Sequence, residues 1–290
     1  PREAVRPDCR AIFPEKGTNV VYQRAFEWGD VGAAFRAADR VVRESFRFHR
    51  AGANAIETFG VIAHWNPQDD SLTCHGSFQS PAHIALGRLA SLRLAPEKLR
   101  LVPYPHGGSF GGKNGGRGTD IAALLSRKSG GRPVKWIEDR IEYLLAGSSQ
   151  AWDRHYEAAV AVKRDGTITG FAVELLDDLG ANAEGFGTIS AVRPLACFTG
   201  NYAIPAASYD LTVVTTNKLP ASPYRGMGLP PHTAVLELML DLAARDLGLD
   251  PAEIRRRNFI AKDRFPYTIP SGNEYDSGDY AAAQDRALAL

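Results

Sequence analysis

The chain has 290 residues, of which 44% are hydrophobic, and this is enough apolar material for one large core or two smaller ones. Its 34 Lys and Arg residues nearly balance its 33 Asp and Glu residues, and the formal net charge of +1 argues against a dedicated nucleic-acid-binding protein. No apolar run is long enough to span a bilayer, and no signal peptide is recognisable, so a cytoplasmic protein is expected.

The first half of the chain begins with a segment, residues 1–25, that lacks a periodic pattern. We predict an extended lead-in there, and a domain over residues 26–290. The opening Pro-Arg-Glu without Met favours a processed or excised chain. The patterns that follow predict a helix over 30–38, a strand over 40–49, a hairpin of strands 60–65 and 71–76, a helix over 81–92 and a strand over 99–104.

The second half begins with a predicted helix over 119–128 and a strand over 133–138. The Asp165-Gly166 turn indicates a hairpin of strands 156–163 and 168–176, and another strand is expected over 209–216. Residues 232–247 have the apolar spacing of an amphipathic helix, and Asp250-Pro251 is typical of the start of the next one. Hairpins mixed with helices predict an α+β fold, with mixed sheets packed against helices.

A glycine-rich segment, His106–Lys113, directly follows the predicted strand 99–104. Its backbone amides could hold an anion or an oxo group, or the glycines could form a structural turn. The segment also matches a phosphate-binding loop through Gly107, Gly112 and Lys113. Asn114 stands where such a loop needs Ser or Thr, and the best downstream acid for a metal would be Asp177, so this alternative is weaker.

The three cysteines, Cys9, Cys74 and Cys197, are far apart and form no CxxC pair. Neither a disulfide framework nor an iron–sulfur cluster is therefore expected, and the thiols should be reduced. If the chemistry is redox chemistry, the electrons must leave through another polypeptide.

Several further segments follow one another in a single order along the chain. They are Glu57-Thr58, Phe78-Gln79, Gly107-Gly108-Ser109-Phe110-Gly111-Gly112-Lys113, Pro223-Tyr224-Arg225-Gly226-Met227-Gly228, Asp250–Ile260 and Ser271–Tyr280. Together they resemble the xanthine dehydrogenase/aldehyde oxidase family of molybdenum hydroxylases, and the likeness extends to large subunits of CO dehydrogenase type. The resemblance implies the first half of the molybdopterin-binding domain.

The implied chemistry is hydroxylation of an aldehyde or N-heterocycle, with water as the source of oxygen. Molybdenum would be held by molybdopterin, in its cytosine dinucleotide form, without a protein ligand to the metal. Electrons would leave through Fe-S clusters and FAD on partner chains or domains. The implied partners are a small-molecule substrate, the rest of the molybdenum subunit, and Fe-S and FAD subunits in an oligomer, with neither nucleic acid nor membrane.

The resemblance also implies roles for individual residues. The cofactor-binding residues would be Gln79, through its side-chain amide, Phe110 and Gly111, through their backbone amides, and Arg225. The substrate pocket would contain Asn114, Arg193 and Met227. The alternatives are an exposed strand residue for Gln79, a local carboxylate pairing with Arg225, and packing or surface positions for the pocket residues.

The sequence departs from the family at several positions. Xanthine-oxidising members carry glutamate at Asn114, which disfavours purines, and CO dehydrogenases carry cysteine at Gly226, which disfavours CO. Ser109 replaces a glycine and would be strained if its φ were positive. The family's general-base glutamate is expected beyond Leu290, so no catalytic residue is assigned, and the chain alone is expected to be inactive. The remaining alternatives are a free-standing module for an anionic ligand and a P-loop-like nucleotide-binding protein.

Overall fold

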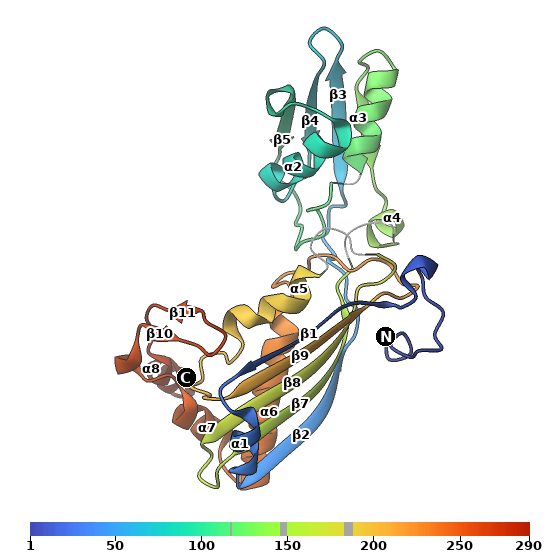
Figure 1. Ribbon diagram of the computed structural model, residues 1–290. Coiled ribbons are helices and arrows are strands. Elements are labelled where there is room, and N and C mark those ends of the chain that lie inside the picture. Colours follow the sequence, from blue (N-terminus) through green and yellow to red (C-terminus); the bar gives the residue numbers. More distant parts are fainter. Residues whose placement is uncertain (117, 146–149, 183–187) are drawn as a thin grey trace.

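The computed structural model describes residues 1–116, 118–145, 150–182 and 188–290. These residues form two lobes, each built on its own sheet (Figure 1). We call residues 51–150 the upper lobe, and residues 1–50 together with 151–290 the lower lobe. The chain therefore passes from the lower lobe into the upper one and back again.

The lower lobe contains a five-stranded sheet with the strand order β1-β9-β8-β7-β2. Its strands are β1 (Val20–Trp28), β2 (Arg40–Phe48), β7 (Asp153–Val162), β8 (Ile168–Asp178) and β9 (Ala207–Val214). β8 and β9 run parallel, whereas the other neighbours are antiparallel, so the sheet is mixed. Strands β7 and β8 form a hairpin around the Asp165-Gly166 turn, as predicted.

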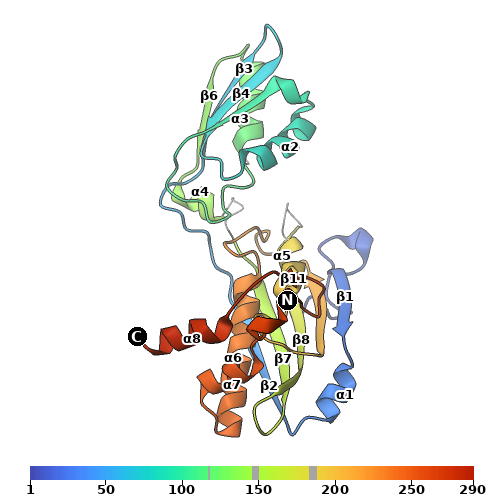
Figure 2. The same ribbon diagram turned by 90° about the vertical axis from the view of Figure 1, so that its left-hand side faces the viewer.

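Helix α6 (Leu229–Leu247) supplies the apolar partner of this sheet (Figure 2). Every second residue of β7, beginning with Tyr156, Ala158 and Val160, is buried in the same cluster as the inward face of α6. The helix begins at Leu229, three residues before the predicted start, because Pro230 and Pro231 occupy the first turn, where no backbone N–H is needed.

The remaining helices and short strands of the lower lobe surround this core. The helices are α1 (Val31–Arg36), α5 (Ile189–Val192), α7 (Pro251–Asn258) and α8 (Tyr280–Leu288), with 3-10 turns η1 (Pro14–Lys16), η3 (Arg193–Cys197) and η4 (Lys262–Arg264). Two short strands, β10 (Tyr267–Thr268) and β11 (Glu274–Tyr275), pair with each other. As predicted, Asp250 caps α7, since its carboxylate accepts hydrogen bonds from the amides of Ala252 and Glu253.

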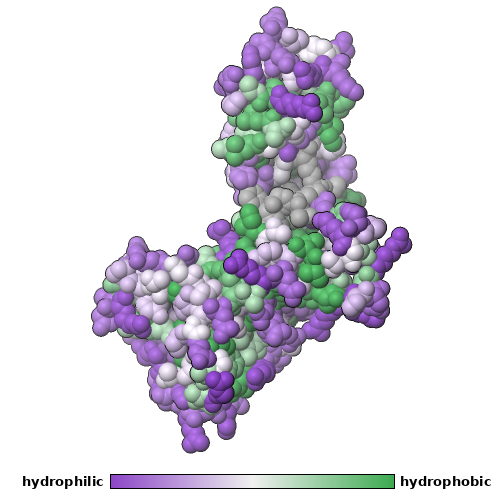
Figure 3. Space-filling model, in the orientation of Figure 1, coloured by the Kyte–Doolittle hydropathy of each residue, from purple (hydrophilic) through white to green (hydrophobic). Residues whose placement is uncertain are grey.

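The upper lobe contains a four-stranded sheet with the order β5-β4-β3-β6. Its elements are β3 (Gly60–Asn66), β4 (Ser71–Gly76), α2 (Pro81–Leu92), η2 (Pro96–Lys98), β5 (Leu99–Pro103), α3 (Gly118–Lys128), β6 (Val134–Ile137) and α4 (Arg140–Leu145). Alternate residues of β3 are buried, and α3 packs on that face. Hydrophilic residues cover the tip of the lobe, whereas hydrophobic ones gather nearer the lower lobe (Figure 3).

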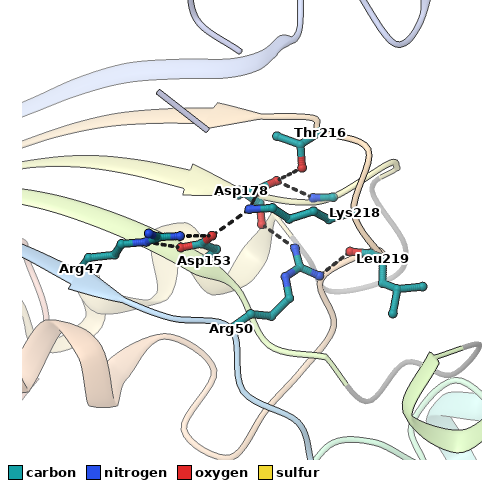
Figure 4. A network of polar contacts seen from close by, with 8 residues as sticks. Arg47, Arg50, Asp153, Asp178, Thr216, Lys218 and Leu219 are labelled. Atoms are coloured by element: carbon teal, nitrogen blue, oxygen red, sulfur yellow. Dashed lines mark hydrogen bonds and ion pairs between the residues drawn. The ribbon is translucent and has the colours of Figure 1, made fainter. Parts of the chain in front are cut away.

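Two chain segments cross between the lobes, and they are bridged at Gly52 and Gln150. Below them, a polar network holds the ends of the lower strands (Figure 4). Asp153 accepts two hydrogen bonds from Arg47, at 3.2 and 3.1 Å, and Lys218 lies 2.7 Å from Asp153 and 2.8 Å from Asp178. Burial opposes ionisation of Asp153, but the bonds from Arg47 and Lys218 outweigh it and lower the pKa of this carboxyl.

The structure confirms the α+β class and the mixed sheets, and the three cysteines are free. Strand β1 differs from prediction, because it begins at Val20, within the segment expected to be a lead-in. It pairs with β9 at the edge of the sheet, where both of its faces are partly exposed, so its sequence lacks a clear alternation. The domain boundary itself stays a prediction. No described helix is both long and apolar enough to cross a bilayer.

Candidate functional site

An open pocket of about 520 Å³ lies between the lobes. The upper lobe contributes Gln79, Phe110, Gly111 and Asn114, and the lower lobe contributes Arg193, Pro223, Tyr224, Arg225, Gly226 and Met227. All seven residues that the sequence singled out therefore line one pocket, although they come from separate segments.

The glycine-rich loop after β5 forms the upper wall. Its backbone is left-handed at Gly108 (φ 93°), Phe110 (φ 53°) and Gly111 (φ 104°), but not at Ser109. Ser109 is therefore not strained, because only a positive φ would have strained it. A Cβ atom on Gly111 would lie 2.2 Å from the carbonyl oxygen of Pro223. Glycine is therefore required at this position because the two lobes meet there.

The side chain of Gln79 has a defined orientation. Its Oε1 accepts hydrogen bonds from the Gly111 amide, at 2.8 Å, and from the Ser109 hydroxyl. Because a backbone N–H can only donate, the carbonyl end must face the loop, and the NH₂ end is turned away from it. The Gly111 amide therefore donates to a side chain of the protein, whereas we predicted that it would donate to the cofactor. The Phe110 amide, by contrast, has no partner among the described residues.

A single carboxylate connects the two ends of the loop. Glu57 Oε2 accepts from the Gly107 amide at 2.8 Å and lies 2.7 Å from Nζ of Lys113, which is fully buried. Burial opposes ionisation of Glu57, but the hydrogen bonds from Lys113 and from the Gly107 amide, together with the charge of Lys113, outweigh it and lower the pKa of the carboxyl. The P-loop alternative is therefore wrong, because the lysine that should bind a phosphate, Lys113, pairs with Glu57 instead. The acid that should bind the metal, Asp177, is buried in an ion pair with Arg154.

The lower wall is formed by a second loop, before α6, and by the turn after α5. The backbone is left-handed at Gly226 (φ 89°), Met227 (φ 46°) and Gly228 (φ 92°). Arg225 and Arg193 are both exposed, and neither forms an ion pair with any residue that the structure describes. The alternative in which Arg225 pairs with a local carboxylate is not observed among these residues.

The chemistry of the lining groups favours an anionic ligand. Two guanidinium groups face the pocket from the lower wall, amides line the upper wall, and no carboxylate is present among the lining residues that the structure describes. The Asn114 Oδ1 atom is buried and lacks a hydrogen-bond partner within the described part of the chain, so it can accept from a ligand. Among the described residues, no group of His, Cys, Asp or Glu could hold a metal ion.

Two residues that hold the upper wall together received no role from the sequence. Glu57 was noted only as part of the Glu57-Thr58 segment, and Ser109 only as a departure from a glycine. The short distance along the chain between Ser109 and Lys113 could have indicated a local hydrogen bond, and the Ser109 hydroxyl does accept from the Lys113 amide at 3.1 Å. The contact with Gln79 depends on the tertiary structure.

Comparisons with known proteins give concordant matches. The model of the molybdopterin cofactor-binding domain matches residues 12–259. The chain is 33% identical to the carbon monoxide dehydrogenase large chain of Hydrogenophaga pseudoflava, covering 99% of this chain and 38% of that one. It is also 33% identical to the nicotine 6-hydroxylase large subunit of Paenarthrobacter nicotinovorans, covering 93% and 33%, respectively.

Among solved structures, quinoline 2-oxidoreductase from Pseudomonas putida 86 superposes with a TM-score of 0.90 at 28% identity. This match covers 99% of the present chain and 36% of the other. The chain thus spans less than two fifths of the length of these relatives.

Proposed function

Because the chain belongs to the molybdopterin cofactor-binding domain family of xanthine dehydrogenase-type large subunits, we propose that the pocket between its lobes binds the molybdenum–pterin cofactor of a hydroxylase. The observation that carries this proposal is the meeting of Gln79, the Gly107–Lys113 loop and the 223–228 loop at one pocket. These three elements are distant along the chain, and the family resemblance had assigned all of them to the cofactor.

The residues present fit such a cofactor. Its phosphate and pterin groups are anionic or rich in hydrogen-bonding atoms, and the lining supplies guanidinium groups and amides. The left-handed glycines allow the backbone to approach a ligand closely, as a Cβ atom would not.

The bound cofactor would supply a centre that accepts two electrons from the substrate. The Gln79 NH₂ group and the Phe110 amide would donate hydrogen bonds to polar atoms near the metal. Gly111 would act through Gln79, since its amide holds the glutamine carbonyl. Arg225 would offset the negative charge of the cofactor. The general-base glutamate that the family resemblance implies has no counterpart among the lining residues within the described part of the chain, so we assign no catalytic residue to this chain.

The proposed reaction is hydroxylation of an aldehyde or N-heterocycle with water as the oxygen source. The relatives include a nicotine 6-hydroxylase and a quinoline 2-oxidoreductase, both named for heterocyclic substrates. Asn114, Arg193 and Met227 would contact the substrate, with the free Asn114 Oδ1 as a hydrogen-bond acceptor. Asn114 and Gly226 stand where purine-oxidising and CO-oxidising members carry glutamate and cysteine, so neither purines nor CO is the proposed substrate.

The complete enzyme would need more than this chain. We propose that the remaining part of the molybdenum subunit and Fe-S and FAD subunits join it in a cytoplasmic oligomer. The cofactor would be the cytosine dinucleotide form. Because the chain spans 38% of the Hydrogenophaga relative, the isolated chain should bind the cofactor weakly and lack activity. A free-standing module for another anionic ligand is the alternative. Arg193 and Arg225, which form no ion pair with the residues that the structure describes, favour both functions equally.

Titration of the isolated chain with molybdopterin cytosine dinucleotide, followed by fluorescence quenching, tests the proposal. We expect weak, saturable binding that Arg225→Gln lowers about tenfold, the effect of losing one charge-assisted hydrogen bond. Arg286→Gln, an exposed arginine on α8, is the control and should leave binding unchanged.

Aldehyde-dependent dye reduction should be absent for the isolated chain. No saturable binding, or equal effects of both substitutions, would contradict the pocket assignment, and turnover by the chain alone would contradict its incompleteness. Tighter binding of inorganic phosphate than of the pterin would favour the alternative module.

A further inference from the structure

Arg154, near the start of β7, is a fully buried cation in the lower lobe. Its guanidinium group faces the carboxylate of Asp177 on β8, with Nε and one terminal nitrogen each 3.1 Å from a carboxylate oxygen. Both side chains are removed from water, and the two-point contact compensates their opposite charges. The pair does not line the pocket, so ligand binding does not explain it.

The remaining donors of Arg154 reach the two segments that form the lower wall. One terminal nitrogen donates to the Ser190 carbonyl at 2.6 Å, and the other to the Gly228 carbonyl at 3.3 Å and the Tyr156 hydroxyl at 3.4 Å. All five N–H groups of the guanidinium therefore have an acceptor. Ser190 lies on α5, three residues before Arg193, and Gly228 directly follows Met227.

The same two segments are also in direct contact with each other. A Cβ atom on Gly228 would lie 2.0 Å from the Ser190 carbonyl oxygen and 2.7 Å from a terminal nitrogen of Arg154. Two carbonyl oxygens at this junction thus accept from one cation. Without it, both carbonyl oxygens would lose a hydrogen bond from a charged donor, which is costly in a protein interior.

We propose that Arg154 is a positioning residue for the pocket. It holds the segment that carries Arg193 and the segment that carries Arg225 and Met227 at a set spacing, while Asp177 balances its charge. A lysine would keep the charge but lose the planar group that reaches both carbonyls at once. The nature of the ligand rests on the proposed function, whereas the connection between the two segments does not.

Hydrogen exchange measured by mass spectrometry on Arg154→Lys tests this connection without any ligand. Amide exchange in peptides covering residues 188–193 and 224–229 should rise together, by about tenfold, as expected for the loss of a charge-assisted hydrogen bond. Arg255→Lys is the matched control, because Arg255 pairs with Glu237 and Asp241 in the same lobe, each at 2.7 Å, away from the pocket. It should change exchange around α6 and α7 and leave the two peptides unchanged.

A second variant, Gly228→Ala, perturbs the junction from the loop side and leaves both Arg154 and Asp177 in the sequence. It should raise exchange in residues 188–193 as well as in its own loop. The proposal is overturned if either peptide responds without the other, or if Arg255→Lys reproduces the pattern.

Titration with molybdopterin cytosine dinucleotide supplies the functional result. Arg154→Lys should weaken binding about tenfold, while Arg255→Lys should not, because only the first moves the arginine-bearing segments. If the wild-type chain binds no pterin, the proposed function fails, whereas the exchange experiment still decides the role of Arg154. If exchange rises but affinity is unchanged, Arg154 is structural, and the positioning role is overturned.

Discussion

The two lobes build their halves of the pocket by different physical means. In the upper wall, neutral groups hold the residues that line the pocket, since Gln79 accepts from the Gly111 amide and the Ser109 hydroxyl. The ion pair of this wall, Lys113 with Glu57, joins the ends of the loop, and its carboxylate side chain is 47% exposed. In the lower wall, a buried ion pair of Arg154 and Asp177 anchors the loops through their carbonyl groups. Loss of a neutral hydrogen bond costs little, whereas an uncompensated buried charge costs much. The lower wall should therefore tolerate substitution less well.

The cores of the lobes also differ. The buried hydrophobic cluster of the lower lobe contains residues of its strands and of the long helix α6. The buried cluster of the upper lobe is smaller. The upper lobe also leaves large apolar side chains in solvent, with Leu86 68%, Ile141 67% and Ile137 62% exposed. Hydrophobic residues gather on this part of the surface in Figure 3. Less apolar area is buried there, so the upper lobe should be the less stable of the two.

The largest expected effect is that of Arg154→Met. Removal of the cation leaves the buried Asp177 carboxylate without its partner, and the free energy of unfolding of the lower lobe should fall by about 3–5 kcal/mol. Urea denaturation followed by circular dichroism measures the loss, and hydrogen exchange assigns it to a lobe. Arg255→Met, which removes a less buried arginine, should cost less. Equal losses would remove the distinction between the walls.

Acidification should also act mainly on the lower lobe. His232 lies fully buried in its core, with Nε2 2.7 Å from the Phe198 carbonyl oxygen, and burial lowers the pKa of the imidazole from 6.5 to about 4. Because the unfolded chain takes up this proton first, the contribution of neutral His232 is present above pH 6.5 and is lost as the pH falls towards 4. The loss should be about 3 kcal/mol at most, given 1.36 kcal/mol per pKa unit.

Denaturation at pH 7 and at pH 4.5 measures this dependence. His232→Gln keeps a donor for the Phe198 carbonyl but does not titrate, so it should flatten the profile over this range. A profile as steep as that of the wild type would show that other groups control it. Asp153, whose pKa is lowered, adds a further loss only when the pH falls below its ordinary value of 3.8.

Gly111→Ala should have an intermediate effect, at the contact between the lobes. The added Cβ would lie 2.2 Å from the Pro223 carbonyl oxygen, and alanine is strained at φ 104°. We expect a loss of about 1–3 kcal/mol, together with weaker cofactor binding. Gly130→Ala is the matched control, since Gly130 has φ 74° and nothing within 4 Å of the added atom. If both variants bind the cofactor like the wild type, the contact between the lobes does not shape the pocket.

Ser109→Ala should have the smallest effect. It removes one donor to Gln79 and the acceptor of the Lys113 amide, so we expect a loss of about 1 kcal/mol, confined to the upper lobe. Ser129→Ala removes a comparable hydrogen bond, 2.9 Å to the Ser126 carbonyl, far from the pocket. Only Ser109→Ala should alter cofactor affinity, as measured by the same titration. An effect as large as that of Arg154→Met would contradict the contrast between the walls.

Local signals in the sequence were sufficient for many elements. The β7–β8 hairpin forms around the Asp165-Gly166 turn, and helices α1 and α7 begin directly after their caps, Asp30 and Asp250. These signals work because the interactions that they predict form within a few residues. Strand β1 was missed because an edge strand with two partly exposed faces has no clear period, and its pairing with β9 joins distant parts of the chain.

The sequence by itself determined which chemical groups the pocket holds, because the glycine-bearing loops, Gln79 and the two arginines are recognisable as short segments. Only the tertiary structure decided how these groups are held. Arg154 bonds to Asp177, Ser190 and Gly228, which lie 23, 36 and 74 residues further along the chain. No local pattern encodes such contacts, since they exist only after the lower sheet has formed and the loops have been brought together.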